Sequence, residues 1–286
     1  MILVTGGAGF IGSHLCKRLI REGYDVVSLD DYSTGSESNH HPGVDYRRGH
    51  TTQIASLVPE PPDVIFHLGE YSRVESSFED DLRVYKSNYL GTYFVNDRWQ
   101  ESGAKLVYAG SSTTFSTDAH GLSSPYSQQK IQNLKRIFSL AEGNACPPWA
   151  ITYFYNVYGP GERPASESGT LIETFRRQYL AGKPLTVVSP GTQRRNFTHV
   201  DDIVDGLMLA MKHDGEFQIG ASESYSVMEV AEMFGGKIEM LPERKGNRMD
   251  STIDTSAIRA LGWEQKNFLK DYIAEIKESV REDCLS

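Results

Sequence analysis

The sequence predicts an α/β protein built on a doubly wound parallel sheet, with a smaller C-terminal lobe that covers the substrate. Short apolar runs of strand length alternate with helical patterns through the first half of its 286 residues, and such alternation is typical of a parallel sheet with helices on both faces. After the segment NVYGPGERP at residues 156–164, loops and shorter elements replace this pattern. We therefore expect one domain at residues 1–157, to which residues 186–212 return, and a substrate-binding lobe formed by residues 158–185 and 213–286.

The individual elements follow from hydrophobic periodicity. In the first domain it predicts strands at Ile2–Val4, Asp25–Leu29, Val64–His67, Lys105–Ala109 and Ala150–Phe154, and helices at Asp81–Glu101 and Tyr126–Glu142, the second with Ile131, Leu134, Phe138 and Ala141 on one face. Further along, it predicts a helix at Leu171–Ala181, strands near Thr186 and Phe217, a helix at Asp201–Lys212 that Asp201 can cap, and a closing amphipathic helix with Leu269, Ile273, Ile276 and Val280.

The first strand leads into a glycine-rich turn and a helix, in the sequence MILVTGGAGFIGSHL. Gly6 permits a tight turn, Gly9 lets the backbone approach a ligand, and Gly12 lets the helix pack closely on the strand. The free N–H groups at the helix start favour an anion. Asp30 ends the second strand, 18 residues beyond Gly12, about where an acid that binds ribose belongs. The pattern predicts a Rossmann-type dinucleotide site.

Composition excludes several classes of function. The formal net charge is −9 and no basic block is present, so nucleic acid and anionic membranes are not expected as partners. The three cysteines are too few and too scattered for a zinc cluster or a disulfide framework, and we expect no metal. No apolar run approaches membrane-spanning length, and a strand that begins at Ile2 leaves no room for a signal peptide, so a cytoplasmic location is expected.

A possible catalytic group follows the strand at Lys105–Ala109, where AGSSTTFS precedes SPYSQQK. Tyr126 and Lys130 are four residues apart and therefore lie on one face of a helix. A free phenol is a poor base at neutral pH, but a neighbouring ammonium and the helix N-terminus favour the phenolate. A serine after the strand could hydrogen-bond the reacting hydroxyl of a substrate. The alternative interpretation of this spacing is an exposed amphipathic helix without chemistry.

Together, these motifs resemble those of extended short-chain dehydrogenases/reductases of the nucleotide-sugar epimerase and dehydratase family, with most likeness to UDP-hexose 4-epimerases. The resemblance covers nearly the whole chain, through GGAGFIG, LDD, VIFHLGE, SNYLGT, GSSTTF, PYSQQK, YFYNVYGPGERP, TQRRNFTHVDD and the terminal ALGW. It implies NAD as cofactor, because Asp30 has no basic substitute nearby, and a nucleotide sugar as substrate. It also implies a homodimer formed by the two long helices, although a monomer stays possible.

The resemblance also implies a role for individual residues. Its cofactor-binding set comprises Gly6, Gly9, Phe10, Ile11 and Gly12 at the pyrophosphate, Asp30 at the adenosine ribose, Leu68 and Gly69 near the nicotinamide, Asn88 buried beside the active site, and Tyr126 and Lys130. Its catalytic set comprises Ser111, Tyr126 and Lys130, with Ser112 as the alternative hydroxyl. Its substrate-binding set comprises Ser111, Ser112 and Asn156, the diphosphate arginines Arg195 and Arg244, and Ser251 as the residue bordering the C2 substituent of the sugar. His67 and His199 are expected to serve strand packing and hydrogen bonding.

Three departures from the family pattern stand out. His50 follows Gly49 where the family often has an acid beside adenine, the segment from Ser111 to Tyr126 is shorter than usual, and Asn196 replaces an aspartate after the diphosphate arginine. None of these changes removes a reacting group.

The residues after Ser111 bear on the choice of reaction. Dehydratases of the family usually carry an Asp–Glu pair there, whereas Ser112 and Thr113 occupy those positions in this chain and cannot act as carboxylate acid or base. The sequence therefore favours a UDP-sugar 4-epimerase that works through a transient 4-keto sugar. A ketoreductase or an atypical dehydratase is the alternative, and a non-catalytic NAD-binding regulatory protein is a more distant one. The nucleotide and the sugar stay open.

Overall fold

The computed structural model describes residues 1–72, 75–115, 124–143, 146–163, 170–243 and 253–283. The chain forms two compact units. The first unit comprises Met1–Tyr153 and Val204–Gln218, and the second comprises Phe154–Ile203 and Ile219–Ser286.

A seven-stranded sheet forms the centre of the first unit, with the strand order β11-β6-β5-β4-β1-β2-β3. Its strands are β1 (Ile2–Thr5), β2 (Val26–Asp30), β3 (Val44–Arg48), β4 (Val64–His67), β5 (Lys105–Ala109), β6 (Trp149–Phe154) and β11 (Gly215–Ile219). The pairs β1–β2, β1–β4, β2–β3, β4–β5 and β5–β6 are parallel. Strand β1 lies between β4 and β2, and the chain order of the strands changes direction at this point of the sheet. In folds of this kind, ligands bind in the crevice at the carboxyl ends of the strands beside such a point. The predicted fold class is confirmed.

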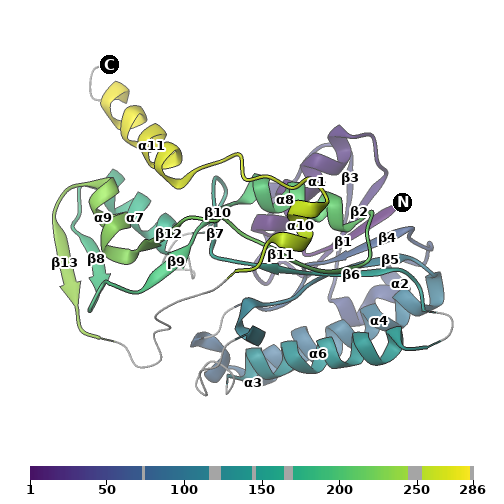
Figure 1. Cartoon of the computed structure of the whole chain (residues 1–286). Helices are drawn as coiled ribbons and strands as arrows, with labels where there is room; N and C mark the ends of the chain where they lie inside the picture. Colours follow the sequence, from purple (N-terminus) through teal and green to yellow (C-terminus); the bar gives the residue numbers. More distant parts are fainter. Residues whose placement is uncertain (73–74, 116–123, 144–145, 164–169, 244–252, 284–286) are drawn as a thin grey trace. The chain divides into compact units, whose positions relative to one another are not determined.

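Helices cover both faces of this sheet, with α1 and α8 on one face and α4 and α6 on the other (Figure 1). Double coverage explains why β1, β2 and β5 are buried at every residue and are mostly apolar, without an alternation of polar and apolar residues. The helices of this unit are α1 (Phe10–Arg21), α2 (Ile54–Leu57), α3 (Asp81–Val84), α4 (Gly91–Ser102), α6 (Pro125–Ala141) and most of α8 (Val200–Ala210), and the short 3₁₀ segments are η1 (Glu37–Asn39), η2 (Thr51–Gln53), η3 (Glu75–Phe78) and η5 (Ser112–Phe115).

The long helix expected at Asp81–Glu101 contains a π-helical segment, η4 (Tyr85–Leu90), between α3 and α4. Such segments insert a wider turn into a helix and occur often at functional sites. Asn88 lies inside this segment and is fully buried. Hydrophobic periodicity does not reveal the insertion, because one extra residue changes the phase of the helix without interrupting it.

The second unit contains short paired strands and packed helices. Its elements are β7 (Val157–Tyr158), α7 (Leu171–Leu180), β8 (Leu185–Val188), β9 (Arg194–Asn196), β10 (Thr198–His199), β12 (Ser224–Ser226), α9 (Val227–Phe234), β13 (Ile238–Leu241), α10 (Ser256–Ala260) and α11 (Leu269–Asp283). Strand pairs form between β7 and β10, β8 and β13, and β9 and β12. Its core is apolar and aromatic, and includes Tyr158, Phe175, Phe197, Phe234 and Ile273.

The boundaries of the two units differ from those expected from sequence. The segment that returns to the first unit is Val204–Gln218, not 186–212, and it contains β11, which the sequence analysis placed in the C-terminal lobe. Strand β11 belongs to the first unit because it lies next to β6 at the edge of the central sheet. Strands β8, β9 and β10 stay in the second unit because their partners β13, β12 and β7 lie there.

Candidate active site

The glycine turn after β1 is built on contacts too close for side chains. Gly6 has a φ of +75°, and an added Cβ there would lie 2.8 Å from the Cα of Gly69, so the turns after β1 and β4 touch through backbone alone. A Cβ on Gly12 would lie 2.1 Å from the carbonyl oxygen of Gly6, whereas one on Gly9 would lie 3.1 Å from it. Phe10 and Ile11 form the first turn of α1 and are half-buried. This backbone cradle fits a pyrophosphate, whose oxygens take the N–H groups at a helix N-terminus.

Asp30 ends β2, and its carboxylate is held by the backbone of two loops. One oxygen accepts a hydrogen bond from the Ala8 N–H at 2.9 Å and the other from the Tyr32 N–H at 2.8 Å. The Asp30 side chain therefore stands beside the glycine turn, as a ribose-binding acid requires. The acid and the glycine cradle together fit NAD.

Tyr126 and Lys130 lie on the buried face of α6, as the sequence predicts. They are 7% and 4% exposed, and the Lys130 Nζ lies 5.9 Å from the centre of the Tyr126 ring. Helix α6 begins at Pro125, and the Ser124 hydroxyl caps it by accepting the Ser127 N–H at 3.1 Å. A capped N-terminus with proline in the first turn fixes the start of the helix directly before the phenol. An exposed helix face does not fit this burial, and the catalytic role of Tyr126 and Lys130 stays a prediction.

Ser111 follows β5 and is 8% exposed. Its hydroxyl shares a hydrogen bond of 2.9 Å with the Thr113 hydroxyl, and it accepts the Thr113 N–H at 3.3 Å. Ser112 begins η5 and is only half-buried. The assignment of the catalytic hydroxyl to Ser111, with Ser112 as alternative, stays a prediction, and residues 116–123, which hold most of the segment before Tyr126, lie outside the described residues.

The structure reveals a buried acid that the sequence analysis did not select. Glu70 directly follows Leu68 and Gly69, and its carboxylate forms an ion pair with Lys130, with both side chains 5% exposed or less. Burial by itself lowers the pKa of the Lys130 ammonium, but the Glu70 carboxylate, with the Tyr108 and Tyr126 phenols, outweighs burial and raises that pKa above its ordinary value. A signal was present in the sequence, because a charged residue directly after a buried strand of a parallel sheet lies at the ligand-binding edge.

Asn88 binds the loop that carries Glu70. Its side-chain oxygen accepts the Tyr71 N–H at 2.7 Å, and its side-chain nitrogen donates to the Tyr71 carbonyl at 2.9 Å. The Asn88 carbonyl accepts a hydrogen bond of 3.0 Å from the Asn133 side chain on α6. The π-helical turn thereby places Asn88 between the loop after β4 and α6, and the role of Asn88 at the cofactor stays a prediction.

His50 caps η2. Its ring accepts the Thr52 N–H at 3.2 Å, and the Gln53 side chain accepts the His50 N–H at 3.1 Å, which together form a capping box. Burial lowers the pKa of the His50 ring, so the ring is neutral and able to accept. His50, which stands where the family often has an acid, therefore caps a 3₁₀ helix.

Two arginines of the substrate motif have different surroundings within the second unit. On β9, Arg194 donates to the hydroxyl and carbonyl oxygens of Ser224 and pairs with Glu229 at 3.0 Å. Arg195 is the next residue of the strand and points to the opposite face. Its guanidinium donates to the Arg194 carbonyl at 2.8 Å. The Arg194 side chain thus connects β9 to Ser224 and Glu229. The role of Arg195 at a diphosphate stays a prediction.

Asn156 and Asn196 lie close together in the second unit. Asn156 is exposed and has a φ of +37°, a region that few residues other than glycine adopt and in which asparagine is enriched. Its side-chain nitrogen donates to the Asn196 carbonyl at 3.0 Å. The Asn196 side chain donates to the carbonyl oxygens of Ala221 and Glu223, at 2.9 and 3.3 Å. An ionised aspartate has no hydrogen to donate, which explains asparagine at this position.

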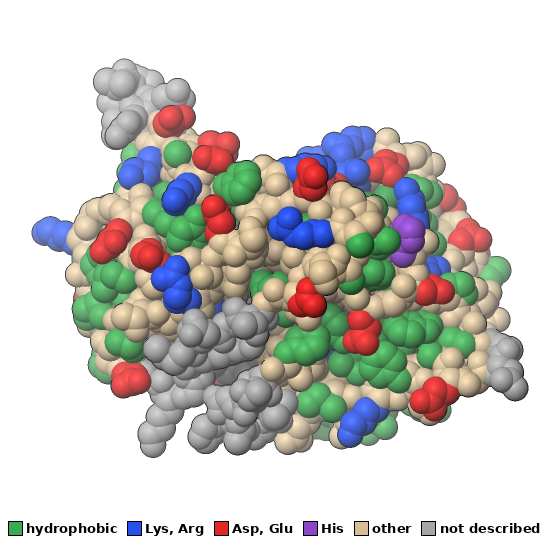
Figure 2. All heavy atoms as spheres, viewed as in Figure 1, with side chains coloured by type: hydrophobic (Ala, Val, Ile, Leu, Met, Phe, Trp, Pro, Cys, Tyr) green, Lys and Arg blue, Asp and Glu red, His purple; other side chains and the backbone are tan. Residues whose placement is uncertain are grey.

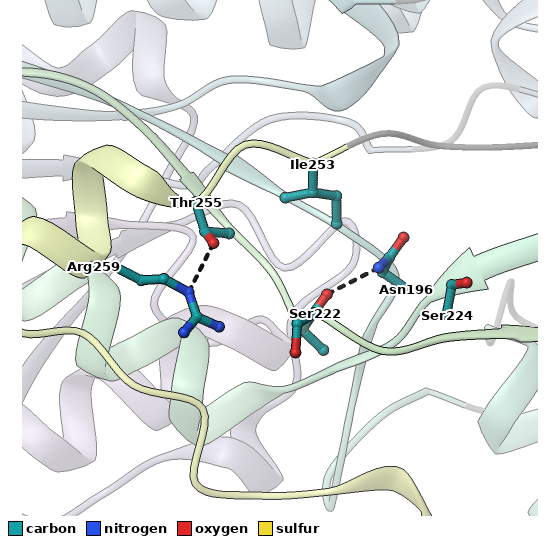
Figure 3. A pocket seen from close by; sticks show the side chains of 7 residues that line it. Asn196, Ser222, Ser224, Ile253, Thr255 and Arg259 are labelled. Atoms are coloured by element: carbon teal, nitrogen blue, oxygen red, sulfur yellow. Dashed lines mark hydrogen bonds between the residues drawn. The ribbon is translucent and has the colours of Figure 1, made fainter.

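A pocket of about 470 Å³ adjoins Asn196 in the second unit (Figure 3). It is lined by Asn196, Ala221, Ser222, Ser224, Ile253, Thr255 and Arg259. The Arg259 guanidinium donates to the Thr255 hydroxyl at 2.9 Å. Of the predicted substrate residues, Arg244 and Ser251 lie outside the described residues.

Two kinds of feature are absent from the described part of the chain. No helix there is long and apolar enough to span a membrane. No group of three or more His, Cys, Asp and Glu side chains there could hold a metal ion.

Comparison with known proteins defines the class that this site indicates. The model of the NAD dependent epimerase/dehydratase family matches residues 2–220. The chain therefore belongs to the NAD-dependent epimerase/dehydratase family, which confirms the resemblance and NAD as the cofactor.

The relatives differ in their reactions. UDP-glucuronic acid decarboxylase 6 of Arabidopsis thaliana is 30% identical over 310 residues, which cover 98% of this chain and 88% of that protein. UDP-glucose 4-epimerase of Mycolicibacterium smegmatis is 29% identical, and 98% of each chain is covered. The crystal structure of UDP-glucose 4-epimerase from Thermotoga maritima with UDP-glucose matches with a TM-score of 0.89 at 26% identity, covering 100% of this chain and 99% of that one. Membership of the family thus leaves several sugar-nucleotide reactions open.

Proposed function

We propose that the protein interconverts C4 epimers of a UDP-hexose or a UDP-N-acetylhexosamine through a transient 4-keto sugar. The observation that supports the proposal is the placement of the three predicted catalytic residues, with Tyr126 and Lys130 buried on one face of α6 and Ser111 after β5 in the same unit. A non-catalytic NAD-binding protein has no need of this group.

Each residue has a defined task. Tyr126 removes the proton from the O4 hydroxyl, and the Lys130 ammonium favours the phenolate that does so. Ser111 donates a hydrogen bond to O4 and orients it. The chemistry that NAD supplies when bound is reversible hydride transfer at C4. After the 4-keto sugar turns its other face to the site, Tyr126 returns the proton to O4, so no proton is gained or lost overall.

Decarboxylation of a UDP-uronic acid is the second candidate, favoured by the 30% identity to a UDP-glucuronic acid decarboxylase. The same three residues would remove the O4 proton while the C4 hydride would pass to bound NAD, which would place a ketone β to the C6 carboxylate and allow loss of CO₂; return of the hydride from NADH to C4 would give the UDP-pentose and regenerate NAD. Dehydration is less well supported, because Ser112 and Thr113 stand where an acid and a base are needed. A one-way ketoreductase would use the same group but consume NADH.

The deciding experiment incubates the purified protein with UDP-glucose, UDP-N-acetylglucosamine, UDP-glucuronic acid and dTDP-glucose, and identifies the products by NMR. The C4 epimer of a UDP-hexose supports the proposal. A UDP-pentose with CO₂ identifies a decarboxylase, and a 4-keto-6-deoxy sugar a dehydratase. No product from any substrate, in a preparation that retains NAD, overturns the proposal.

We propose further that Asn156, Arg195 and Arg244 bind the sugar nucleotide, and that Ser251 borders the C2 substituent. A serine there leaves room for an acetamido group. Ser251→Tyr should then reduce kcat/KM for the N-acetylated pair about ten- to a hundredfold, because overfilling a pocket costs roughly 1–3 kcal/mol. Equal losses on UDP-glucose, or no wild-type activity on N-acetylated sugars, would contradict this gate.

A homodimer through the two long helices is also proposed. Large side chains are exposed near α3 and on α4: Phe78 is 60%, Leu82 74% and Phe94 40% exposed. Figure 2 shows hydrophobic side chains gathered over α4 and α6. Light scattering should give twice the mass of 32.0 kDa, and Leu82→Asp should give the monomer mass. A wild-type monomer would refute this assembly. With Cys16 and Cys146 as free thiols, we also propose a cytoplasmic location.

A further inference from the structure

The proposed epimerase mechanism assigns no step to the buried carboxylate of Glu70, although this carboxylate contacts Lys130. We propose that Glu70 is the counter-ion and positioning residue of Lys130, which keeps this lysine charged and fixes its ammonium at the active site. The inference rests on the proposed function only for the meaning of Lys130 in catalysis. The ion pair itself belongs to the first unit whatever the substrate is.

The hydrogen bonds of Glu70 exclude a direct role on substrate. Its Oε1 accepts from the Thr92 hydroxyl at 2.8 Å, from the Asn133 side chain at 2.9 Å and from the Tyr108 hydroxyl at 3.2 Å. Its Oε2 accepts from the Lys130 ammonium. Four donors from three helices and strands saturate a carboxylate whose side chain is 4% exposed. Glu70 therefore acts through Lys130.

The same hydrogen bonds hold the ammonium in place. Among the described residues, Lys130 donates to Glu70 and, at 2.5 Å, to the Ala109 carbonyl at the end of β5. An ammonium has three N–H donors, so one is left for the cofactor or the phenol. Glu70 and the strand end thus aim the third hydrogen into the active site, which is the geometry that Lys130 needs for either task.

A directed chain of hydrogen bonds continues from Glu70 to the cofactor turn. Because the Thr92 hydroxyl gives its only hydrogen to Glu70, the His67 Nε2, 2.9 Å away, must donate to Thr92. The His67 Nδ1 then accepts from the Thr5 hydroxyl at 2.7 Å, and Thr5 accepts the Gly69 N–H at 3.0 Å. Burial lowers the pKa of His67 to about 4, which agrees with the neutral tautomer this chain requires. Each group of this chain therefore donates toward the Glu70 carboxylate, which accepts at its end.

The charges around Lys130 decide what Glu70 does. The titratable groups that face the ammonium are Glu70 from the loop after β4, His67 from β4, Tyr108 from β5 and Tyr126 from α6 itself. Glu70 is the one carboxylate among these four groups, and it forms the ion pair with Lys130, whereas burial lowers the pKa of His67 and raises that of Tyr108. Without Glu70, burial is left unopposed and the lysine loses its proton at a far lower pH, as buried lysines without a partner do.

Stability as a function of pH tests this without any assay of turnover. In the wild type, Lys130 is protonated in the folded and the unfolded protein from pH 7 to 10. In Glu70→Gln it is neutral when folded and protonated when unfolded, so the variant gains stability relative to wild type as pH rises. Denaturant titrations give the unfolding constant of each protein. We expect the constant of Glu70→Gln divided by that of the wild type to fall by up to about tenfold per pH unit over this range.

Thr92→Val is the matched control, because it removes a hydrogen bond to the same carboxylate without removing charge. Its stability deficit should be independent of pH. A deficit of Glu70→Gln that is equally independent of pH would overturn the proposal. If Glu70→Gln does not fold, the double variant Glu70→Gln/Lys130→Met decides: a folded double variant supports charge compensation, because neutral replacement of a buried ion pair is tolerated, and an unfolded one overturns it.

The pH profile of kcat/KM supplies the catalytic readout. Glu70→Gln should lose activity on the alkaline side, with its descending limb at least one pH unit below that of the wild type. Asp214→Asn is the control, because it removes the carboxylate that lies 2.5 Å from another buried lysine, Lys105, at the opposite end of β5. The descending limb of the pH profile of Asp214→Asn should stay where it is in the wild type. An unmoved limb in Glu70→Gln refutes the catalytic meaning of the pair. A wild type without turnover refutes the proposed function instead and leaves the stability test standing.

Discussion

Gly12→Ala should lower the stability of the protein, whereas Gly9→Ala should leave stability nearly unchanged and weaken NAD binding. Gly9 is the N-cap residue of α1 and Gly12 lies in its first turn, and both are predicted to serve the pyrophosphate. In the structure an added Cβ on Gly12 points into the protein and meets the Gly6 carbonyl oxygen at 2.1 Å. A Cβ on Gly9 meets the same oxygen at 3.1 Å and, among the described residues other than its chain neighbours, no further heavy atom within 4 Å, so it points to the open side of the turn.

These distances set the magnitudes. For Gly12→Ala the helix and the turn must separate by about 0.9 Å to restore a contact of 3.0 Å. Overpacking of this kind costs roughly 1–3 kcal/mol, of which the better helix propensity of alanine offsets about 1 kcal/mol. In a chain of this size the expected decrease in Tm is several degrees. Gly9→Ala needs an adjustment of only a few tenths of an ångström, so its Tm should change little.

NAD affinity should distinguish the two variants as well, because the loss of affinity is expected for Gly9→Ala. Gly9→Ala places a methyl group where the pyrophosphate approaches the backbone, and we expect NAD binding weakened at least about tenfold, the effect of roughly 1.4 kcal/mol. The assays are differential scanning fluorimetry of the NAD-free protein and calorimetric titration with NAD. If Gly9→Ala binds NAD normally, the pyrophosphate does not lie against Gly9; if Gly12→Ala is as stable as wild type, the close contact is not rigid.

Four further outcomes are expected. Tyr126→Phe should retain NAD but lose about 10²- to 10⁴-fold in turnover; a near-normal rate would exclude Tyr126 as the base. Arg195→Ala should weaken UDP binding about ten- to a hundredfold in calorimetry, whereas Arg194→Ala should lower Tm and leave UDP affinity unchanged; the reverse pattern would exchange their roles. Asn196→Asp should lower stability by about 1–3 kcal/mol at pH 8 in denaturant titrations, because an ionised carboxylate cannot donate to the two carbonyl groups; an unchanged value would show that those hydrogen bonds are not needed. His67, whose folded pKa is lowered to about 4, should cost stability as pH falls below about 6.5, where the unfolded histidine binds a proton that the folded one does not; His67→Gln should flatten that part of the stability curve.

Local features of this protein were predictable from sequence because they depend on spacing along the chain. The strands β4 and β5 begin and end where the apolar runs do, and β1, β2 and β6 differ by a residue or so. The strand–glycine–helix turn and the four-residue spacing of Tyr126 and Lys130 place their groups through backbone geometry that neighbouring residues specify. These features indicate the fold class, the cofactor and the face of α6 that carries Tyr126 and Lys130.

Contacts between distant segments were not predictable in this way. The buried face of α6 includes Asn133 and Lys130 as well as Leu134 and Ile137, while Ile131 and Phe138, predicted to share a face with Leu134, are only half-buried. A polar residue on that face is stable only because its partners come from elsewhere. The helix alone gives no sign of them.

The sequence by itself determined where the strands, the glycine turn and the catalytic helix lie, since periodicity and short-range spacing are local properties. Tertiary structure alone decided that β11 joins the edge of the central sheet and that Glu70 meets Lys130, 60 residues further along the chain. The physical reason is the strand order: β4 and β5 are neighbours in the sheet, so the loop after β4 and the helix after β5 meet at one edge. A buried charge is tolerated there only because that meeting supplies its counter-ion and hydrogen-bond partners.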